Sequence, residues 1–268
     1  IGQPDLPTPQ AAIDAIRNID RKVLEYSPSA GNRSYREKLV GYYAKFNINL
    51  TADDIIITSG GSEAVLFSFL SCLNPGDEII VPEPAYANYM AFAISAGAKI
   101  RTIATTIEEG FSLPKVEKFE ELINERTKAI LICNPNNPTG VLYPKEILLE
   151  IIQIARESGL LIFADEIYDR LVMDGKQHIS LASLTEDVPV ITLNGLSKSH
   201  CLCGYRCGWM VISGPRELTE DYRQGIIQLT SLRLCANTMA QIVIPAALDD
   251  METPASMIRP GGRIYEQR

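Results

Sequence analysis

The sequence lacks three features that would each have pointed to a class of protein. It has no excess of positive charge, since 33 acidic residues outnumber 25 basic ones, which argues against a nucleic-acid partner. It has no apolar run near the roughly 20 residues that span a bilayer. Its six cysteines show no disulfide framework, and the spacing of Cys201, Cys203 and Cys207 matches no common zinc site. We therefore expect a cytoplasmic protein without a metal, a nucleic acid or a membrane as partner.

What is present indicates a globular α/β protein. Hydrophobic residues make up 46% of the chain and charged residues 22%, which allows a substantial core. Short apolar stretches alternate with helical patterns, so we expect a three-layer α/β/α sandwich with a mostly parallel sheet. Strands are expected at 55–58, 78–81, 99–103, 129–133, 160–164, 190–193 and 208–212. Helices are expected at 11–24, 34–46, 64–73, 114–126, 144–158, 215–230 and 238–248.

Polar clusters follow four of the predicted strands. They are Gly60–Ser62, Asn134–Asn137, Asp165–Tyr168 and Ser197–Lys198. Because the carboxyl ends of parallel strands meet at one edge of a sheet, we expect these clusters to converge on one site. Glycines between a strand and a helix aim free N–H groups at an anion, and an acid ending a buried strand is costly unless it is paired.

The segment around Lys198 suggests which ligand the site takes. Lys198 lies just past a buried strand, and Arg206 follows between Gly204 and Gly208. An arginine offers a rigid donor fork for a phosphate, and the two glycines are predicted to let the backbone pass close to another group. A lysine that can be desolvated, beside a phosphate-binding arginine, is what a pyridoxal phosphate (PLP) site needs.

Two motifs carry a resemblance to a known family. Ser197-Lys198 followed by Gly204-Tyr205-Arg206-Cys207-Gly208-Trp209 resembles the lysine segment of the class I/II aminotransferases, which are fold type I PLP enzymes. Asn134-Pro135-Asn136-Asn137-Pro138-Thr139-Gly140 is similar to another specific signature of that family. The resemblance extends over almost the whole chain. The later half is most similar to bacterial glutamate–pyruvate (alanine) aminotransferases, and the earlier half to aspartate-type aminotransferases.

The resemblance implies a reaction and a role for each site residue. An amino group would move between an L-amino acid (alanine, glutamate or aspartate) and a 2-oxo acid (pyruvate or 2-oxoglutarate). Lys198 would bond the cofactor and then carry the proton, while Asp165 would hold the proton on the pyridine nitrogen. Further roles are implied for Tyr168 and Asn137 at the 3′-oxygen, for Gly61, Ser62, Ser197 and Arg206 at the phosphate, for Tyr86 stacked on the ring, for Gly2 and Asn137 at the substrate carboxylate, and for Tyr26 at the cofactor of a partner subunit in a homodimer.

The sequence also departs from the family pattern. Gly195 stands where many relatives carry a serine, so a phosphate hydroxyl is either missing or supplied by Ser197. We expect an N-terminal segment at 1–30, a large PLP-binding domain at 31–250, and at 251–268 the start of a linker helix to a C-terminal domain that is absent. That domain would supply the arginine for the substrate carboxylate.

Other interpretations stay open at this stage. The same residues would serve another fold type I PLP enzyme, such as a C–S lyase, or a fragment that binds PLP without turnover. A serine hydrolase would use Ser62, Asp165 and either His178 or His200. We interpret both histidines as surface or loop residues, Tyr89 as a core residue, and Glu166 and Asp169 as structural.

Overall fold

Seven strands form one sheet in the computed structural model, in the order β1-β7-β6-β5-β4-β2-β3. The structure describes residues 2–267, so Ile1 and Arg268, at the ends of the two predicted terminal segments, lie outside the described residues. The strands are β1 (Ile55–Thr58), β2 (Glu78–Glu83), β3 (Lys99–Ala104), β4 (Thr127–Cys133), β5 (Leu161–Asp165), β6 (Val190–Gly195) and β7 (Gly208–Ser213).

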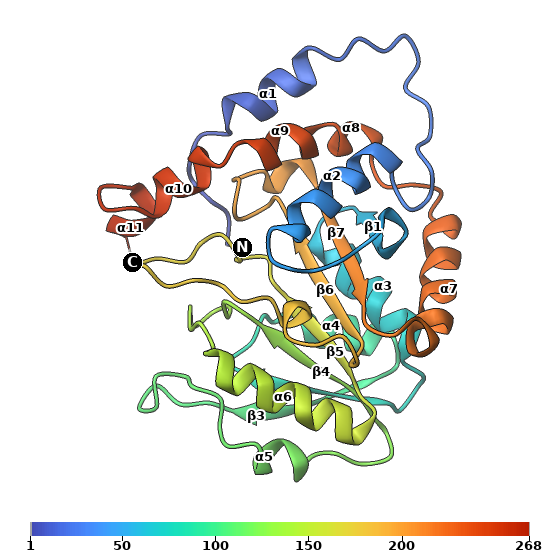
Figure 1. The fold of residues 1–268 in the computed structure, drawn as a ribbon, viewed down its shortest axis with the longest axis vertical. Helices are drawn as coiled ribbons and strands as arrows, with labels where there is room; N and C mark the ends of the chain where they lie inside the picture. The colour runs from blue at the N-terminus through green and yellow to red at the C-terminus, as the bar shows by residue number, and fades with distance from the viewer. Residues whose placement is uncertain (1, 268) are drawn as a thin grey trace.

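The sheet is parallel except for β7, which runs antiparallel to both of its neighbours, β1 and β6. The strands β2, β3, β4, β5 and β6 pair in parallel. The prediction of a mostly parallel sheet is therefore confirmed. One edge of the sheet collects the carboxyl ends of these strands and of β1, together with the amino end of β7 (Figure 1).

Helices cover both faces of the sheet. One core packs α2 (Arg33–Ala44), α6 (Lys145–Ser158) and α9 (Val243–Asp249) against it, and the other packs α3 (Gly61–Cys72), α4 (Asn88–Ser95) and α7 (Arg216–Leu232). Alternate residues of a strand point to opposite faces, so Ile55 and Ile57 belong to the first core and Ile56 to the second. The α/β/α sandwich is confirmed, with α6 crossing one face of the sheet in Figure 1.

Several helices are shorter than the sequence predicted. The first, α1 (Gln10–Arg17), ends well before residue 24. Val23 and Leu24 are 66% and 55% exposed, so no core contact extends the helix to them. Of the predicted helix at 114–126, only α5 (Glu117–Glu120) forms, with Phe119 as its buried residue.

The C-terminal part of the chain is a series of short helices. The predicted helix at 238–248 is divided into α8 (Thr238–Gln241) and α9. Beyond it, α10 (Glu252–Ile258) and α11 (Arg263–Glu266) flank Pro260-Gly261, which cannot continue a helix. Short 3-10 turns lie at Ala52–Asp54, Leu181–Ser183 and Cys203–Tyr205. Within residues 2–267, no helix is long and apolar enough to cross a membrane.

Candidate active site

Lys198 lies just beyond the carboxyl end of β6, in the segment that turns back toward β7. Its side chain is half-buried, and Nζ donates a hydrogen bond to the carbonyl oxygen of Gly2. A side chain at Gly2 would begin only 3.8 Å from that same Nζ. Ser197, the residue before the lysine, is buried. The N-terminal segment therefore lies directly against the amine, with a backbone polar group facing it.

Asp165 ends β5, the strand next to β6, and is almost fully buried. Tyr89 of α4 donates its hydroxyl proton to Oδ2 at 2.5 Å, and the Ile167 N–H donates to Oδ1 at 3.2 Å. Burial raises the pKa of Asp165 above its ordinary value, and these two bonds oppose the rise. The carboxylate is thus desolvated and oriented, so a cationic or N–H ligand at this edge would be strongly attracted to it.

Two tyrosines complete the wall beside Asp165. The half-buried Tyr86 packs edge-on against Tyr89, with ring centroids 5.3 Å apart. Burial raises the pKa of Tyr168 to about 12, with smaller contributions from Cys133, Asp165 and Tyr86. Tyr168 therefore stays a neutral hydroxyl that can donate a hydrogen bond. Tyr86, Tyr168 and Asp165 form one aromatic and acidic wall.

In the asparagine-rich loop after β4, two asparagine side chains make hydrogen bonds within the protein and a third does not. The Asn134 side chain accepts from the Tyr143 N–H at 3.0 Å, and its backbone N–H donates to the carbonyl of Asp165 at 2.9 Å. Asn136 accepts from both the N–H and the hydroxyl of Thr139. The half-buried Asn137 side chain makes no hydrogen bond to another of residues 2–267, so it is free to meet a ligand.

An anion cradle forms where β1 leads into α3. Gly60, the N-cap of α3, has φ of 80°, and a Cβ there would lie 2.3 Å from Arg206 Nη2. The guanidinium also donates to the carbonyl oxygens of Cys203 at 2.9 Å and Ser59 at 3.5 Å. Gly61 and Ser62 open the helix, whose first N–H groups have no helical partner. A helix N-terminus beside an arginine favours an anion such as phosphate.

Glycines let the segments of this site approach one another. A Cβ at Gly208 would lie 2.5 Å from the Gly60 carbonyl carbon, and one at Gly195 would lie 2.8 Å from the Cys207 oxygen. No side chain fits at Gly195, which explains why no serine occurs there. A Cβ at Gly204 would meet nothing within 4 Å, so the predicted close approach at that glycine is wrong.

Gly208→Ala is expected to lower the free energy of unfolding by about 1–3 kcal/mol, because the added methyl group meets the backbone of Gly60. Urea denaturation measures the change. Gly204→Ala lies in the same segment in open space and should stay within about 0.5 kcal/mol of the wild type. Equal losses for the two variants would contradict the assigned packing.

Tyr26 stands apart from these residues. It is 76% exposed and lines a cavity of about 550 Å³ together with residues from the junction of α7 and α8. That lining contains none of the other predicted site residues. Within one chain, the structure therefore does not bring Tyr26 to Lys198.

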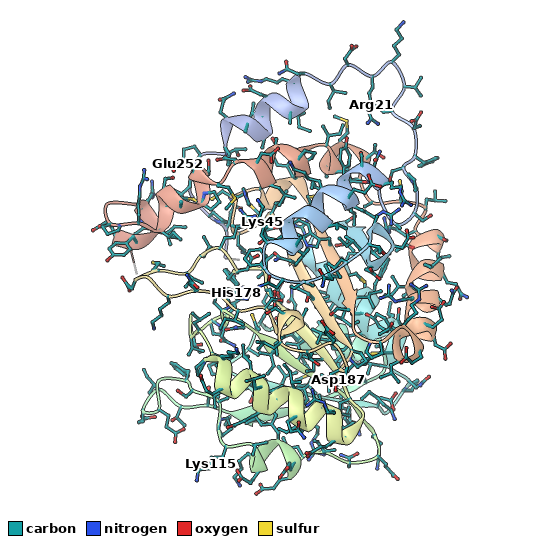
Figure 2. The ribbon with its side chains drawn as sticks, viewed as in Figure 1. Arg21, Lys45, Lys115, His178, Asp187 and Glu252 are labelled. Atoms are coloured by element: carbon teal, nitrogen blue, oxygen red, sulfur yellow. The ribbon has the colours of Figure 1, made fainter. Side chains whose placement is uncertain are left out.

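The two histidines lie in loop segments, as predicted, but neither is a surface residue. His200 is 1% exposed and its Nδ1 lies 2.9 Å from the Ser199 hydroxyl. His178, labelled in Figure 2, is half-buried, and its Nε2 lies 3.9 Å from a carboxylate oxygen of Glu166. Burial raises the pKa of Glu166 to about 8. Asp165 accepts from Tyr89 and Ile167 and from no histidine among residues 2–267, so the aspartate–histidine pair of a hydrolase triad is not formed.

Comparison with known proteins now decides the family. The family model of the class I and II aminotransferases matches residues 1–258. The chain belongs to the class I and II aminotransferase family. Glutamate-pyruvate aminotransferase AlaA of Escherichia coli K12 is 41% identical over 258 residues, which are 96% of this chain and 63% of that protein. An alanine aminotransferase of Mycobacterium bovis is 38% identical, over 91% of this chain and 57% of its own length.

Solved aminotransferase structures share the fold. An aminotransferase from Escherichia coli superposes with a TM-score of 0.96 at 38% identity, covering 100% of this chain and 67% of its own. A single mutant of the Thermus thermophilus aspartate aminotransferase gives a TM-score of 0.86 at 32% identity, covering 95% of this chain and 65% of its own. The chain spans a little under two thirds of the length of AlaA.

Sequence reasoning named Tyr89 and Gly60 but missed the part that each plays at the site. Tyr89 is a core residue as predicted, at 1% exposure, but its hydroxyl also orients Asp165. Its place one turn after Tyr86 was a usable signal, because residues three apart share a face. Gly60 makes the room that Arg206 occupies. A residue without a side chain is needed at position 60 because β7 lies beside β1, and this pairing joins segments far apart in the chain.

Proposed function

We propose that this chain carries the PLP-binding part of an amino-acid transaminase, which moves an amino group between alanine, glutamate or aspartate and pyruvate or 2-oxoglutarate. The observation that supports it most is that Lys198, the buried Asp165 and the anion cradle around Arg206 share one edge of the sheet. The names of the relatives, which are glutamate–pyruvate, alanine and aspartate aminotransferases, support the same substrate class.

The residues fit PLP chemically. A phosphate needs donors and positive charge, which Arg206 and the N–H groups at Gly61 and Ser62 supply, with Ser197 as a further hydroxyl. A pyridine nitrogen needs an acid held close, which the buried Asp165 supplies. The free amide of Asn137 and the neutral hydroxyl of Tyr168 suit the 3′-oxygen, and Tyr86 offers a ring to stack on.

PLP, when bound, supplies an electron sink for the carbanion that forms at the α-carbon of the amino acid. Asp165 would hold a proton on the ring nitrogen, so that the sink stays effective. The amine of Lys198 would move the α-proton as a general base and acid. The backbone of Gly2, whose carbonyl oxygen accepts a hydrogen bond from that amine, would contact the substrate carboxylate. Asn137 orients that carboxylate.

The experiment is an absorption spectrum of the purified chain with PLP added. We expect a visible band that bleaches with alanine, glutamate or aspartate and recovers with pyruvate or 2-oxoglutarate. Release of ammonia or a thiol, without such recovery, would identify a lyase. A spectrum equal to that of free PLP would contradict the proposal.

We also propose that the protein forms a homodimer. The exposed apolar side chains Val23, Leu24, Leu232 and Leu234 gather near the cavity that Tyr26 lines, and exposed apolar patches mark interaction surfaces. A second copy would cover them and bring the partner subunit's Tyr26 toward the site. Sedimentation velocity should give twice the chain mass, and a monomer at micromolar concentration would contradict this.

We propose the cytoplasm as its compartment. All six cysteines are described and all are free thiols, which a reducing environment preserves. Cell fractionation tests this proposal, and recovery of the protein outside the cytoplasm would contradict it.

A further inference from the structure

Asp169 lies at the centre of a hydrogen-bonded cluster beneath the candidate site. Its Oδ2 accepts a bond of 2.5 Å from the Tyr42 hydroxyl of α2 and another of 3.0 Å from Asn194 Nδ2 of β6. Arg170 places its guanidinium 4.4 Å from the centre of the Tyr42 ring, and its Nε donates to the Tyr42 oxygen at 3.3 Å. A carboxylate that accepts two hydrogen bonds beside a cation is held firmly.

Asp169 and Asn194, which this bond joins, lie next to the two segments that carry the proposed chemistry. Asp169 directly follows Tyr168. Asn194 precedes Lys198 by four residues, and its Oδ1 accepts from the Gly195 N–H at 2.7 Å, which fixes the amide. The contact between Asp169 and Asn194 therefore spans the gap between the tyrosine segment and the lysine segment.

Backbone pairing alone does not hold these segments together. The ladder between β5 and β6 ends at Asp165 and Leu193. One more backbone bond follows, from the Glu166 N–H to the Leu193 oxygen at 2.9 Å. Beyond that point no backbone hydrogen bond joins the two segments among residues 2–267, and the side-chain bond from Asn194 to Asp169 is the next hydrogen bond between them.

We propose that Asp169 is a positioning residue, which sets the lysine segment against the tyrosine segment by bonding Asn194. The inference rests on the proposed function, because it takes Lys198 and Tyr168 as the groups that need relative placement. Asp169 does not touch the reacting atoms. It acts through the short stretch from Asn194 to Lys198, which has no regular structure after Gly195.

The test replaces Asp169 and then exchanges the partners. Asp169→Ala removes the Oδ2 oxygen that accepts from both Tyr42 and Asn194, so the bridge is lost. Amide hydrogen exchange of residues 196–200, followed in the PLP-free chain, should rise about tenfold for the loss of one bond to a charged group. The double variant Asp169→Asn/Asn194→Asp restores a donor and an acceptor, and exchange should return to the wild-type rate.

With PLP present, the same variants separate placement from binding. Asp169→Ala should lower kcat for transamination about tenfold while the dissociation constant for PLP changes little, because Arg206 and the cradle are untouched. The matched control is Asp54→Ala, which removes a partly buried ion pair of 2.7 Å with Arg223 outside the site. It should leave exchange at 196–200 unchanged.

Unchanged exchange at 196–200 in Asp169→Ala would overturn the proposal, and so would failure of the exchanged pair to give the wild-type rate. If Asp169→Ala does not fold, Asn194→Ala removes the same bond, and the same rise in exchange is required. A wild-type chain that takes up no PLP would overturn the proposed function alone, since the exchange measurement in the PLP-free chain still decides the bridge.

Discussion

Lys198→Ala is expected to lower transamination by about a thousandfold or more, the largest effect of any single substitution in this chain. Removing the amine takes away both the covalent partner of PLP and the group that carries the proton, and each role contributes steeply to the rate. Borohydride reduction followed by peptide mapping should fix the cofactor on Lys198 in the wild type and nowhere in the variant. The visible band should change in the same way.

A matched control is Lys115→Ala, an exposed lysine at the far end of the molecule in Figure 2. It should keep the visible band, the adduct on Lys198 and the wild-type rate. Unfolding should not explain the difference in rate between the two variants. The amine of Lys198 makes one hydrogen bond, to the Gly2 carbonyl, and its loss leaves the sheet intact. An adduct that persists in Lys198→Ala would contradict the assignment of the lysine.

The parts of the fold that follow from local pattern could be predicted from the sequence. The strand at Ile55–Thr58 is found with the predicted bounds, because a short buried run between turn residues has few alternatives. The helix at 144–158 is found as α6, since its apolar stripe has a sheet to cover. By contrast, the apolar residues toward Leu24 have no core surface to pack against, and that helix ends at Arg17.

The site could be predicted as a set of residues but not as a set of contacts. Polar clusters at strand ends must converge in a parallel sheet, so Asp165 and Lys198 could be placed at one edge. The antiparallel entry of β7, which brings Arg206 over Gly60, is a tertiary pairing that no local pattern carries. The same holds for Tyr89 and Asp165, and for Asp169 and Asn194, which join residues far apart in the chain.

Asp165→Asn is expected to lower transamination by about a hundredfold to a thousandfold, because the neutral amide cannot hold a proton on the pyridine nitrogen. The shape is kept: the amide oxygen still accepts from the Ile167 N–H, and the amide nitrogen can donate to the Tyr89 hydroxyl. The loss should therefore appear in kcat without loss of the folded state. Steady-state kinetics and thermal unfolding, measured on one preparation, test both statements.

Because Asp165 is buried, the free energy of unfolding should fall as pH rises above the ordinary pKa of a carboxyl group. Burial raises the pKa of this carboxyl above its ordinary value of 3.8, so the folded chain binds the proton more tightly than the unfolded chain. The free energy of unfolding then falls as pH rises from 3.8 to the raised pKa. Asn cannot titrate, so the PLP-free variant should gain stability relative to the wild type as pH rises above 3.8 toward the raised pKa.

Glu166, the residue after Asp165, provides the control for the measurements of activity and stability. Glu166 is also buried, with its pKa raised to about 8, and it accepts a bond from the Leu181 N–H, outside the predicted site residues. Glu166→Gln should show the same gain in stability with rising pH while keeping most of the activity. If both substitutions abolished activity alike, general disturbance of the buried acids would explain the loss. If only Asp165→Asn does so, the carboxylate at the end of β5 is the one that serves the cofactor.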